Sequence, residues 1–507
     1  MPKKVLLIRP RNVYNYNNYP PLNLILLAST LKRAGFETGI VNAALEPDAL
    51  AKIRGQLPDT FLVAITLLTP EVPDGLAIIK GIRESSNVPI VVGGWHCTLF
   101  PEQMVASPLI DYVIPGEGDD HIVDLAQSLA RGDAPAQKLY PRQFVDLNTL
   151  PEPDYSLDPS IERFITSYLT DTLAQYVPQP IRWLPYEGSR GCPSQCTFCI
   201  NVVTGNTKYR KKTAEKILDE MEHIVKKHQL THFKIIDDNF FVDIGRVREV
   251  CRGMIERKID VTWDGECRCD YFNDRLMNDE TLALARKSGL VQLTLGIESG
   301  SQRTLDLMKK NITVEQAENA VRMCDRHGII ARSSFMLEIP GDTKEDIVKT
   351  IRFINRMRQY PYFSCGVGTF RPYPKCELSE RLKKEGHLTE PRDLEEWSSQ
   401  EAMNMYTAAE YVRPWQKNGQ YAMTAAYYLN MESSIRVGSH QMTRRTDRIK
   451  NSLYMAIAKI RNRLLFYHFP VDMQLYKNFL EDFYRKQADK DKREQYPLAA
   501  PDKDCDS

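Results

Sequence analysis

Apolar runs that alternate with helical segments through residues 1–131 constrain the fold of this chain more than any other feature. The runs are short and continuous, which is typical of strands in a parallel sheet that is buried on both faces. The first helical segment starts with proline and ends with glycine, as helices often do. We therefore predict an α/β domain with a doubly wound, Rossmann-like parallel sheet. Its expected strands are KVLLIRP, ETGIVNA, FLVAITL, VPIVVGG and IDYVIPGEG.

A second alternating series starts at residue 181 and predicts six further strand–helix units. Six units fall short of the eight that close a full TIM barrel, so we expect a partial (β/α)6 TIM-like barrel. Functional groups in both folds are expected on the loops that follow the strands. The expected barrel strands cover residues 181–189, 232–238, 261–268, 291–299, 329–341 and 364–374.

The length of 507 residues exceeds what one hydrophobic core supports, so several domains are expected. We predict a Rossmann-like domain, a linker, the partial barrel, a helical C-terminal domain and a disordered tail. These parts cover residues 1–131, 132–180, 181–385, 386–487 and 488–507.

The net charge excludes few classes of function, because 67 Lys and Arg residues nearly balance 66 Asp and Glu residues. The balance gives no sign of a nucleic-acid partner. The longest apolar run, residues 61–68, is too short to span a membrane, and the N-terminus is a poor signal peptide. The 11 cysteines have no regular disulfide spacing, so we expect a reducing, cytoplasmic location.

Three of these cysteines, Cys192, Cys196 and Cys199, lie within the stretch GSRGCPSQCTFCIN, and no fourth cysteine follows. A structural zinc site needs four ligands, and a disulfide would leave the third thiol unpaired. Three thiolates can hold a 4Fe–4S cluster and leave one iron open to another ligand. We favour the iron–sulfur cluster over zinc, with Phe198 shielding it from water.

At these residues the chain resembles the radical SAM superfamily, whose signature is C-x-x-x-C-x-x-C with an aromatic residue before the third cysteine. The resemblance implies that the open iron binds S-adenosylmethionine (SAM). It further implies that an electron from the cluster cleaves SAM to a 5′-deoxyadenosyl radical, which abstracts hydrogen from an unactivated carbon. A low-potential electron donor of the flavodoxin or ferredoxin type is then expected as a partner.

The same resemblance implies SAM contacts on the loops after successive barrel strands, in IIDDNFF, GECR, GIESGS and SSFMLEIPGDTKED. The first of these departs from the commoner Gly-Gly-Glu of the family. As alternatives, Asp237 and Asp238 could cap a helix, and Glu298 could be a structural carboxylate. The expected SAM contacts are Phe198, Asp237, Asp238, Asn239, Arg268, Glu298, Ser299, Arg332 and Ser334.

The loops GGWHCTLFPE and GEGDD, together with the helical stretch PPLNLILLASTLKRAGFE, resemble the cobalamin-binding domain that precedes many radical SAM barrels. The absence of G-x-G-x-x-G after the first strand argues against a dinucleotide site. The cobalt-ligating pattern D-x-H-x-x-G is also absent, so we expect cobalamin without a histidine ligand. Alternatively the domain no longer binds cobalamin, and Trp95 and His96 only pack. The expected contacts are Thr66, Thr69, Gly93, Gly94, His96, Thr98, Gly116, Glu117 and Gly118.

Together these features predict a cobalamin-dependent radical SAM enzyme that methylates an unactivated carbon of a small-molecule or lipid-like substrate. One alternative is an oxidative cyclase or rearrangement enzyme without methyl transfer, and another is a non-catalytic cobalamin sensor. No catalytic residue beyond the cluster ligands is predicted. The basic run over residues 436–463 predicts either a solvated helix face, which we favour, or a peripheral membrane contact.

Overall fold

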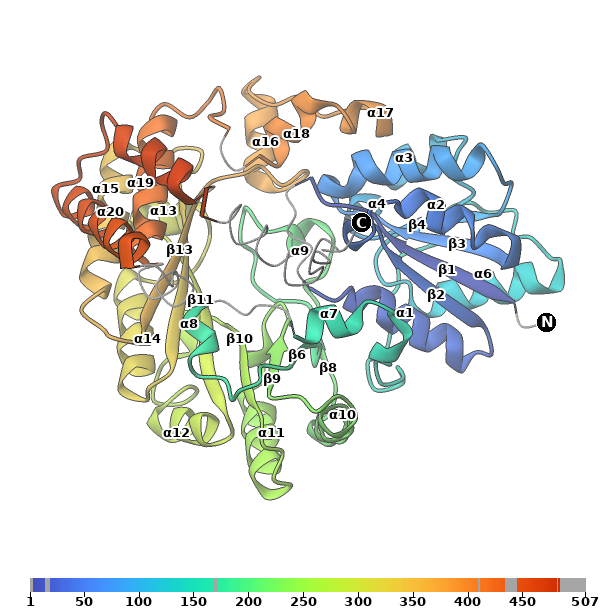
Figure 1. Cartoon of the computed structure of the whole chain (residues 1–507), viewed down its shortest axis with the longest axis horizontal. Coiled ribbons are helices and arrows are strands. Elements are labelled where there is room, and N and C mark those ends of the chain that lie inside the picture. Colours follow the sequence, from blue (N-terminus) through green and yellow to red (C-terminus); the bar gives the residue numbers. More distant parts are fainter. Residues whose placement is uncertain are drawn as a thin grey trace, which may run out of the picture.

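Two parallel sheets and a helical C-terminal region make up the computed structural model of the chain (Figure 1). The structure describes residues 3–13, 19–166, 171–408, 411–433, 445–480 and 482–483. The predicted tail, and Arg436 and Arg444 of the basic run, lie outside these residues.

The N-terminal sheet has the strand order β2-β1-β3-β4-β5, and all its strands are parallel, which confirms the predicted doubly wound sheet. Helices α1 and α6 contact each other, and so do α2 and α3. The order reverses between β1 and β3, and ligands bind at such switch points, beyond the carboxyl ends of the strands. The elements are β1 (Lys4–Arg9), α1 (Leu22–Arg33), β2 (Glu37–Asn42), α2 (Ala49–Arg54), β3 (Thr60–Thr66), α3 (Val72–Arg83), β4 (Ile90–Gly93), α4 (Trp95–Leu99), α5 (Pro101–Ala106), β5 (Tyr112–Ile114) and α6 (Asp119–Arg131).

The segment after α6 crosses between the two sheets and contains the short helices α7 (Ile161–Ile165) and α8 (Asp171–Ala174). Asp154 in this segment accepts a hydrogen bond at 2.8 Å from Lys32 of α1 and another at 2.8 Å from Lys227 of the barrel helix α10 (Ala214–His228). The segment therefore ties a helix of the N-terminal domain to a helix of the barrel.

The second sheet has the order β13-β12-β11-β10-β9-β6, again all parallel, which confirms the predicted six-stranded partial barrel. Amphipathic helices follow its strands and cover its outer face. The strands are β6 (Trp183–Tyr186), β9 (His232–Ile235), β10 (Thr262–Cys267), β11 (Leu290–Glu298), β12 (Ile330–Leu337) and β13 (Phe363–Thr369). The helices are α9 (Ile200–Val203), α10 (Ala214–His228), α11 (Ile244–Glu256), α12 (Asp279–Lys287), α13 (Gln302–Leu307), α14 (Val314–Arg326) and α15 (Lys344–Met357).

The open edge of the barrel sheet at β13 is covered by helix α19 (Gly419–Ser433). The Asn430 side chain accepts a hydrogen bond from the Val367 N–H and donates one to the Val367 carbonyl, both at 2.7 Å. These two bonds replace the pairing that a further strand would make, so the edge is protected from association.

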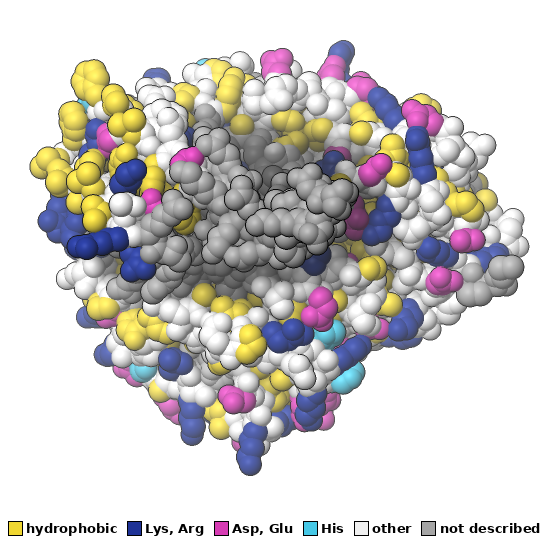
Figure 2. All heavy atoms as spheres, in the orientation of Figure 1, with side chains coloured by type: hydrophobic (Ala, Val, Ile, Leu, Met, Phe, Trp, Pro, Cys, Tyr) yellow, Lys and Arg dark blue, Asp and Glu magenta, His cyan; other side chains and the backbone are white. Residues whose placement is uncertain are grey.

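The remaining helices form the predicted helical C-terminal region, in which α20 packs on α19 and α15. Hydrophobic side chains gather on its surface, at the left of Figure 2. Within the described part of the chain, no helix is both long and apolar enough to cross a membrane. The helices are α16 (Glu377–Lys384), α17 (Leu394–Trp397), α18 (Gln400–Tyr406) and α20 (Arg445–Leu464).

Candidate functional site

A cavity of about 1120 Å³ lies beyond the carboxyl ends of the N-terminal strands. One side is lined by the loops after β1, β3, β4 and β5 and by helix α1, and the other by residues that flank the cysteine loop of the barrel. Its size suits a large cofactor together with a substrate. Both domains therefore contribute to a single cavity.

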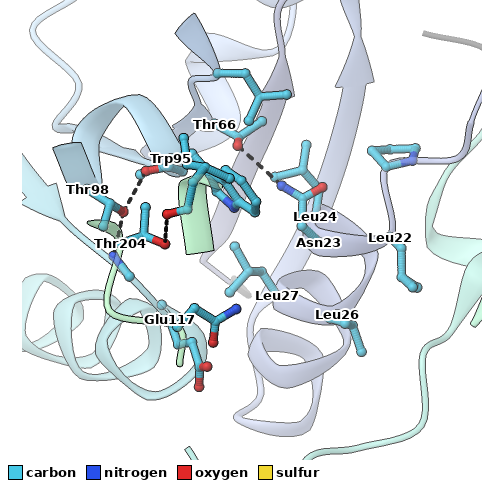
Figure 3. A pocket seen from close by; sticks show the side chains of 18 of the residues that line it. Leu22, Asn23, Leu24, Leu26, Leu27, Thr66, Trp95, Thr98, Glu117 and Thr204 are labelled. Atoms are coloured by element: carbon cyan, nitrogen blue, oxygen red, sulfur yellow. Dashed lines mark hydrogen bonds between the residues drawn. The ribbon is translucent and has the colours of Figure 1, made fainter. Parts of the chain in front are cut away.

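Eight of the nine expected cobalamin contacts line this cavity, and His96 does not. Figure 3 shows how several of them converge from separate loops. Thr98 joins two of these loops, because its hydroxyl donates to the Gly94 carbonyl and accepts from the Gly116 N–H, both at 2.8 Å. The eight residues are Thr66, Thr69, Gly93, Gly94, Thr98, Gly116, Glu117 and Gly118.

Gly94 has a conformation that only glycine adopts without strain, with φ of +94°. A Cβ atom here would lie 2.8 Å from the Leu67 carbonyl oxygen and 2.9 Å from Thr66 Oγ1. Because the closest atom belongs to the backbone, it cannot move aside cheaply. The wall of the cavity at this loop is thus shaped by the absence of a side chain.

His96 is fully buried beneath the loop, with its ring 5.1 Å from the ring of Trp397 in an edge-on contact. Its Nδ1 lies 3.2 Å from the Thr69 hydroxyl, and burial lowers its pKa to about 3. The ring is therefore neutral at ordinary pH and belongs to the interior. Trp95, which precedes it, lines the cavity and is partly exposed (Figure 3).

Helix α1 supplies an apolar wall that the sequence analysis did not assign to the site. Leu22, Leu26 and Leu27 line the cavity from this helix, and Asn23 donates a hydrogen bond at 3.2 Å to the Thr66 hydroxyl (Figure 3). Helical periodicity shows that this helix has an apolar face, but it cannot show whether that face meets the sheet or a ligand.

A short hairpin of β7 (Ser189–Arg190) and β8 (Arg210–Lys211) flanks the cysteine loop and was not predicted. Arg190 forms ion pairs with Asp119 at 2.8 Å and Glu117 at 3.4 Å. Arg210 also donates to Glu117, at 2.8 Å. The cysteine loop is thereby fixed to the loop that follows β5 of the N-terminal sheet.

The three cysteines lie on this loop, with Cys196 buried and Cys192 and Cys199 partly buried. The charge of Cys192 contributes to the raised pKa of both Cys196 and Cys199, so the three thiols are neighbours. Nevertheless, no group of three His, Cys, Asp or Glu side chains in the described residues could hold a single metal ion. Three thiolates can instead hold a 4Fe–4S cluster and leave one iron open.

Burial raises the pKa of the Cys199 thiol to about 11 and also raises that of Cys196. Metal binding must therefore release protons from these thiols. Arg268 and the buried Lys310 favour the Cys196 thiolate through their positive charge. The surroundings of the loop thus suit a negatively charged cluster.

Lys310 is a site residue that the sequence analysis missed. Its ammonium group lies 3.1 Å from a carboxylate oxygen of Glu298 and 5.7 Å from the centre of the Phe198 ring. Burial opposes its charge, but Glu298 and Cys196 together raise its pKa above the ordinary value. Glu298 has φ of +69° at a register shift in β11, a strained position of the kind found at functional sites.

The loop after β9 holds the cysteine loop in place. Asp237 is buried and accepts a hydrogen bond at 2.8 Å from the Gly188 N–H, and burial raises its pKa to about 7. Asp238 accepts one at 3.1 Å from the Gly191 N–H. Neither caps the following helix, whose cap is Asp243.

Asn239, the next residue, reaches the cysteines directly. Its side-chain nitrogen lies 3.7 Å from the sulfur of Cys192 and donates to the Tyr271 hydroxyl at 3.0 Å. Its oxygen is buried without a hydrogen-bond partner, which leaves it able to accept from a ligand.

The remaining expected SAM contacts lie on different parts of the barrel. Ser299 is buried and its hydroxyl is 2.9 Å from that of Thr350, a contact within the protein core. Arg332 and Ser334 are partly exposed and alternate with buried residues along β12, so they share the inner face of the sheet. Arg268 pairs with Asp270 at 2.9 Å.

A further thiol, Cys376, lies beside the cysteine loop although its sequence spacing gives no sign of this. Burial, together with the neighbouring Cys199, raises the pKa of the Cys376 thiol to about 12. The Leu378 N–H donates to the Thr197 carbonyl at 3.2 Å, which holds the start of α16 against the loop.

Comparison with known proteins divides the chain in the same way as its two sheets. Residues 186–354 match the family model for the radical SAM superfamily, and residues 12–126 match the model for the B12 binding domain. The first match runs from the end of β6 into α15, and the second covers the N-terminal domain from the loop before α1 through β2 and into α6.

Individual relatives are similar over most of their length. The chain is 26% identical over 380 residues to an uncharacterized methyltransferase of Pyrococcus horikoshii, covering 71% of this chain and 78% of that protein. It is 27% identical over 398 residues to an anaerobic magnesium-protoporphyrin IX monomethyl ester cyclase of Rubrivivax gelatinosus, covering 75% and 69% respectively.

A solved structure has the same fold across nearly the whole chain. This is the cobalamin-dependent S-adenosylmethionine radical enzyme OxsB with aqua-cobalamin and S-adenosylmethionine bound, with a TM-score of 0.71 at 16% identity. The likeness covers 96% of this chain and 75% of OxsB.

The two matched domains define the cofactors. A radical SAM domain uses a 4Fe–4S cluster with SAM, and a B12 binding domain takes cobalamin. The chain therefore combines a radical SAM domain with a B12 binding domain in front of it.

Proposed function

We propose that the chain is a cobalamin-dependent radical SAM methyltransferase that acts on an unactivated carbon of a small-molecule or lipid-like substrate. The observation that carries this proposal is the single cavity lined by both domains. Methyl transfer to a carbon radical requires that the methyl donor and the radical source face the same substrate. The similarity to a methyltransferase over 71% of this chain supports it.

Within this proposal, Cys192, Cys196 and Cys199 are the cluster ligands. The positive charges of Arg268 and Lys310 beside Cys196 support this assignment, since a cluster with three thiolates is negatively charged. Asn239 and Glu298 are the most direct candidates to hold SAM, because both lie next to the cysteines. The full proposed set of SAM contacts is Phe198, Asp237, Asp238, Asn239, Arg268, Glu298, Ser299, Arg332 and Ser334.

Cobalamin is proposed to lie along the N-terminal side of the cavity. The glycines at 93, 94, 116 and 118 let a flat macrocycle approach the backbone, and α1 provides an apolar wall. The proposed contacts are Thr66, Thr69, Gly93, Gly94, Thr98, Gly116, Glu117 and Gly118. His96, which does not line the cavity, is proposed to support the Thr69 hydroxyl instead of touching cobalamin.

When bound, the cluster and SAM supply a 5′-deoxyadenosyl radical, and methylcobalamin supplies a methyl group. The protein contributes position and a dry environment. The leucines of α1 exclude water from one wall, while the ion pairs of Arg190 fix the cysteine loop relative to the N-terminal domain. Asp237 and Asp238 keep the loop in shape through its backbone N–H groups.

The alternative function is an oxidative cyclisation or rearrangement with the same cofactors. The similarity to a cyclase over 75% of this chain favours it as the second candidate. A low-potential flavodoxin or ferredoxin would supply electrons in either case.

The proposal also includes a cytoplasmic location, which agrees with the free state of every cysteine in the described residues. It further includes a peripheral membrane contact of the basic helix α20. The proposed domain boundaries are those expected from the sequence, at residues 1–131, 132–180, 181–385, 386–487 and 488–507.

The products formed from SAM distinguish these functions. We expect the anaerobically reconstituted protein, given SAM, reduced cobalamin and dithionite, to form both S-adenosylhomocysteine and 5′-deoxyadenosine. The first product reports methyl transfer to cobalamin and the second reports reductive cleavage. Formation of 5′-deoxyadenosine alone would favour the cyclase, and formation of neither product would favour a sensor.

Replacing one cluster ligand should remove the cluster, whereas replacing the neighbouring thiol should not. We expect Cys196→Ala to lose its iron absorbance and all cleavage of SAM, because two thiolates do not hold the cluster. The matched control is Cys376→Ala, which removes a buried thiol beside the same loop and should keep its iron. Equal loss of iron in both variants would contradict the three-thiolate assignment.

A side chain at Gly94 should weaken cobalamin binding. We expect Gly94→Ala to lower the affinity by about tenfold or more, because the strain and the backbone clash together exceed ~1.4 kcal/mol. The matched control is Gly35→Ala, since Gly35 has a similar φ of +89° but no atom within 4 Å of the added carbon. Binding is measured by cobalamin absorbance after gel filtration, and equal affinity of the two variants would refute the assignment.

A further inference from the structure

Helix α20 exposes four large aliphatic side chains and buries two asparagines. Its buried side chains are Asn451, Met455, Ala458 and Asn462. Asn462 donates hydrogen bonds at 3.0 Å to the Tyr428 carbonyl and at 2.7 Å to Glu432. A surface helix ordinarily buries its apolar side chains and exposes its polar ones. Here polar groups are buried, and the large aliphatic side chains point outward.

The outward stripe consists of Ile449, Leu453, Ile460 and Leu464, and Leu464 is 70% exposed. At about 100° per residue these four positions fall within roughly 60° of the helix circumference. The stripe is therefore continuous along the helix and does not result from scattered surface residues.

The chain after α20 extends this surface and is held rigidly. The Arg461 guanidinium donates hydrogen bonds at 3.1 Å to the carbonyls of Phe466, His468 and Phe469. It also pairs with Asp472 at 2.5 Å. This arrangement fixes the turn while Phe469 remains 81% exposed.

These residues form one apolar face on the described part of the chain. Eight of its 17 exposed large hydrophobic side chains lie between residues 449 and 475. Figure 2 shows hydrophobic side chains gathered at the left, next to a group of Lys and Arg. Contiguous apolar surface of this kind marks an interaction site. The apolar face consists of Ile449, Leu453, Ile460, Leu464, Phe466, Phe469, Val471 and Leu475.

Basic side chains border the apolar face. On the helical wheel Arg445, Lys459 and Arg463 lie along one side of the stripe and Lys450 lies on the other, and all four are exposed. Asp447 is the only acidic residue of α20, against six Lys and Arg residues. Long basic side chains beside an apolar stripe can reach lipid phosphates while the stripe enters the acyl region.

We infer that the apolar face of α20 and residues 466–475 docks on an anionic lipid bilayer. The helix lies in the plane of the interface, with its aliphatic stripe below the headgroups and its basic border among them. A second copy of this chain fits less well, because a symmetric dimer through this face would oppose two basic borders. The inference specifies the membrane contact of the proposed function and does not depend on the reaction catalysed.

Cosedimentation of the full-length, reconstituted protein with vesicles tests the inference. We expect strong binding to vesicles of equal parts phosphatidylcholine and phosphatidylglycerol. Binding to phosphatidylcholine alone should be much weaker, and added salt should reduce the binding to anionic vesicles. Absence of binding to the anionic vesicles would overturn the inference.

Substitutions on the face complete the test. The double variant Leu464→Ser/Phe469→Ser should lower the affinity for anionic vesicles by about tenfold or more. Leu276→Ser, at an exposed leucine of the barrel, is the matched control and should bind normally. Both should keep their iron and cleave SAM in solution, which separates this test from that of the proposed function. Unchanged vesicle binding by the double variant would contradict docking on lipid. A double variant that loses self-association and keeps its vesicle binding would contradict it as well.

Discussion

The ion pairs of Arg190 and Arg210 with the loop after β5 are the constraint on which the arrangement of the site depends. Arg190 bonds to Asp119 and Glu117, and all these side chains are largely shielded from water. Removing one partner from such a buried network typically costs about 3–5 kcal/mol, since the remaining charge stays buried. Arg190 precedes Cys192 by two residues, so the same network that joins the domains also positions the cysteine loop.

With that loop fixed, the functional ends of two parallel sheets face one cavity. Each sheet offers its loops at the carboxyl ends of its strands, as α/β folds generally do. The N-terminal loops contribute glycines and hydroxyl groups, and the barrel contributes the carboxylates of Glu187, Asp237 and Asp238, with the cysteines on the adjoining loop. These different residue types match the chemistry of the two cofactors. A macrocycle must approach the backbone closely, whereas a cluster needs thiolate ligands.

The order of the strands and the cysteine loop could be predicted from the sequence, because apolar runs and short spacings are local signals. Contacts between distant segments could not. Lys310 and Cys376 lie beside the cysteines through the packing of α13 and α16, and nothing in their local sequence indicates this. His96 follows a residue on the cavity wall, yet its ring turns into the core toward Trp397 from the C-terminal region. The basic run of α20 was expected to be a solvated helix face. Large aliphatic side chains are exposed beside it as well, while Asn462 bonds to α19 on the buried side.

The central claim is that the cluster and cobalamin share one cavity. Pulsed electron paramagnetic resonance on the reconstituted protein, with the cluster reduced and cobalamin in its Co(II) form, measures the separation of the two centres through their magnetic interaction. The account predicts a strong interaction that corresponds to two centres across a single cavity. An absent or weak interaction, with both cofactors fully bound, would contradict it.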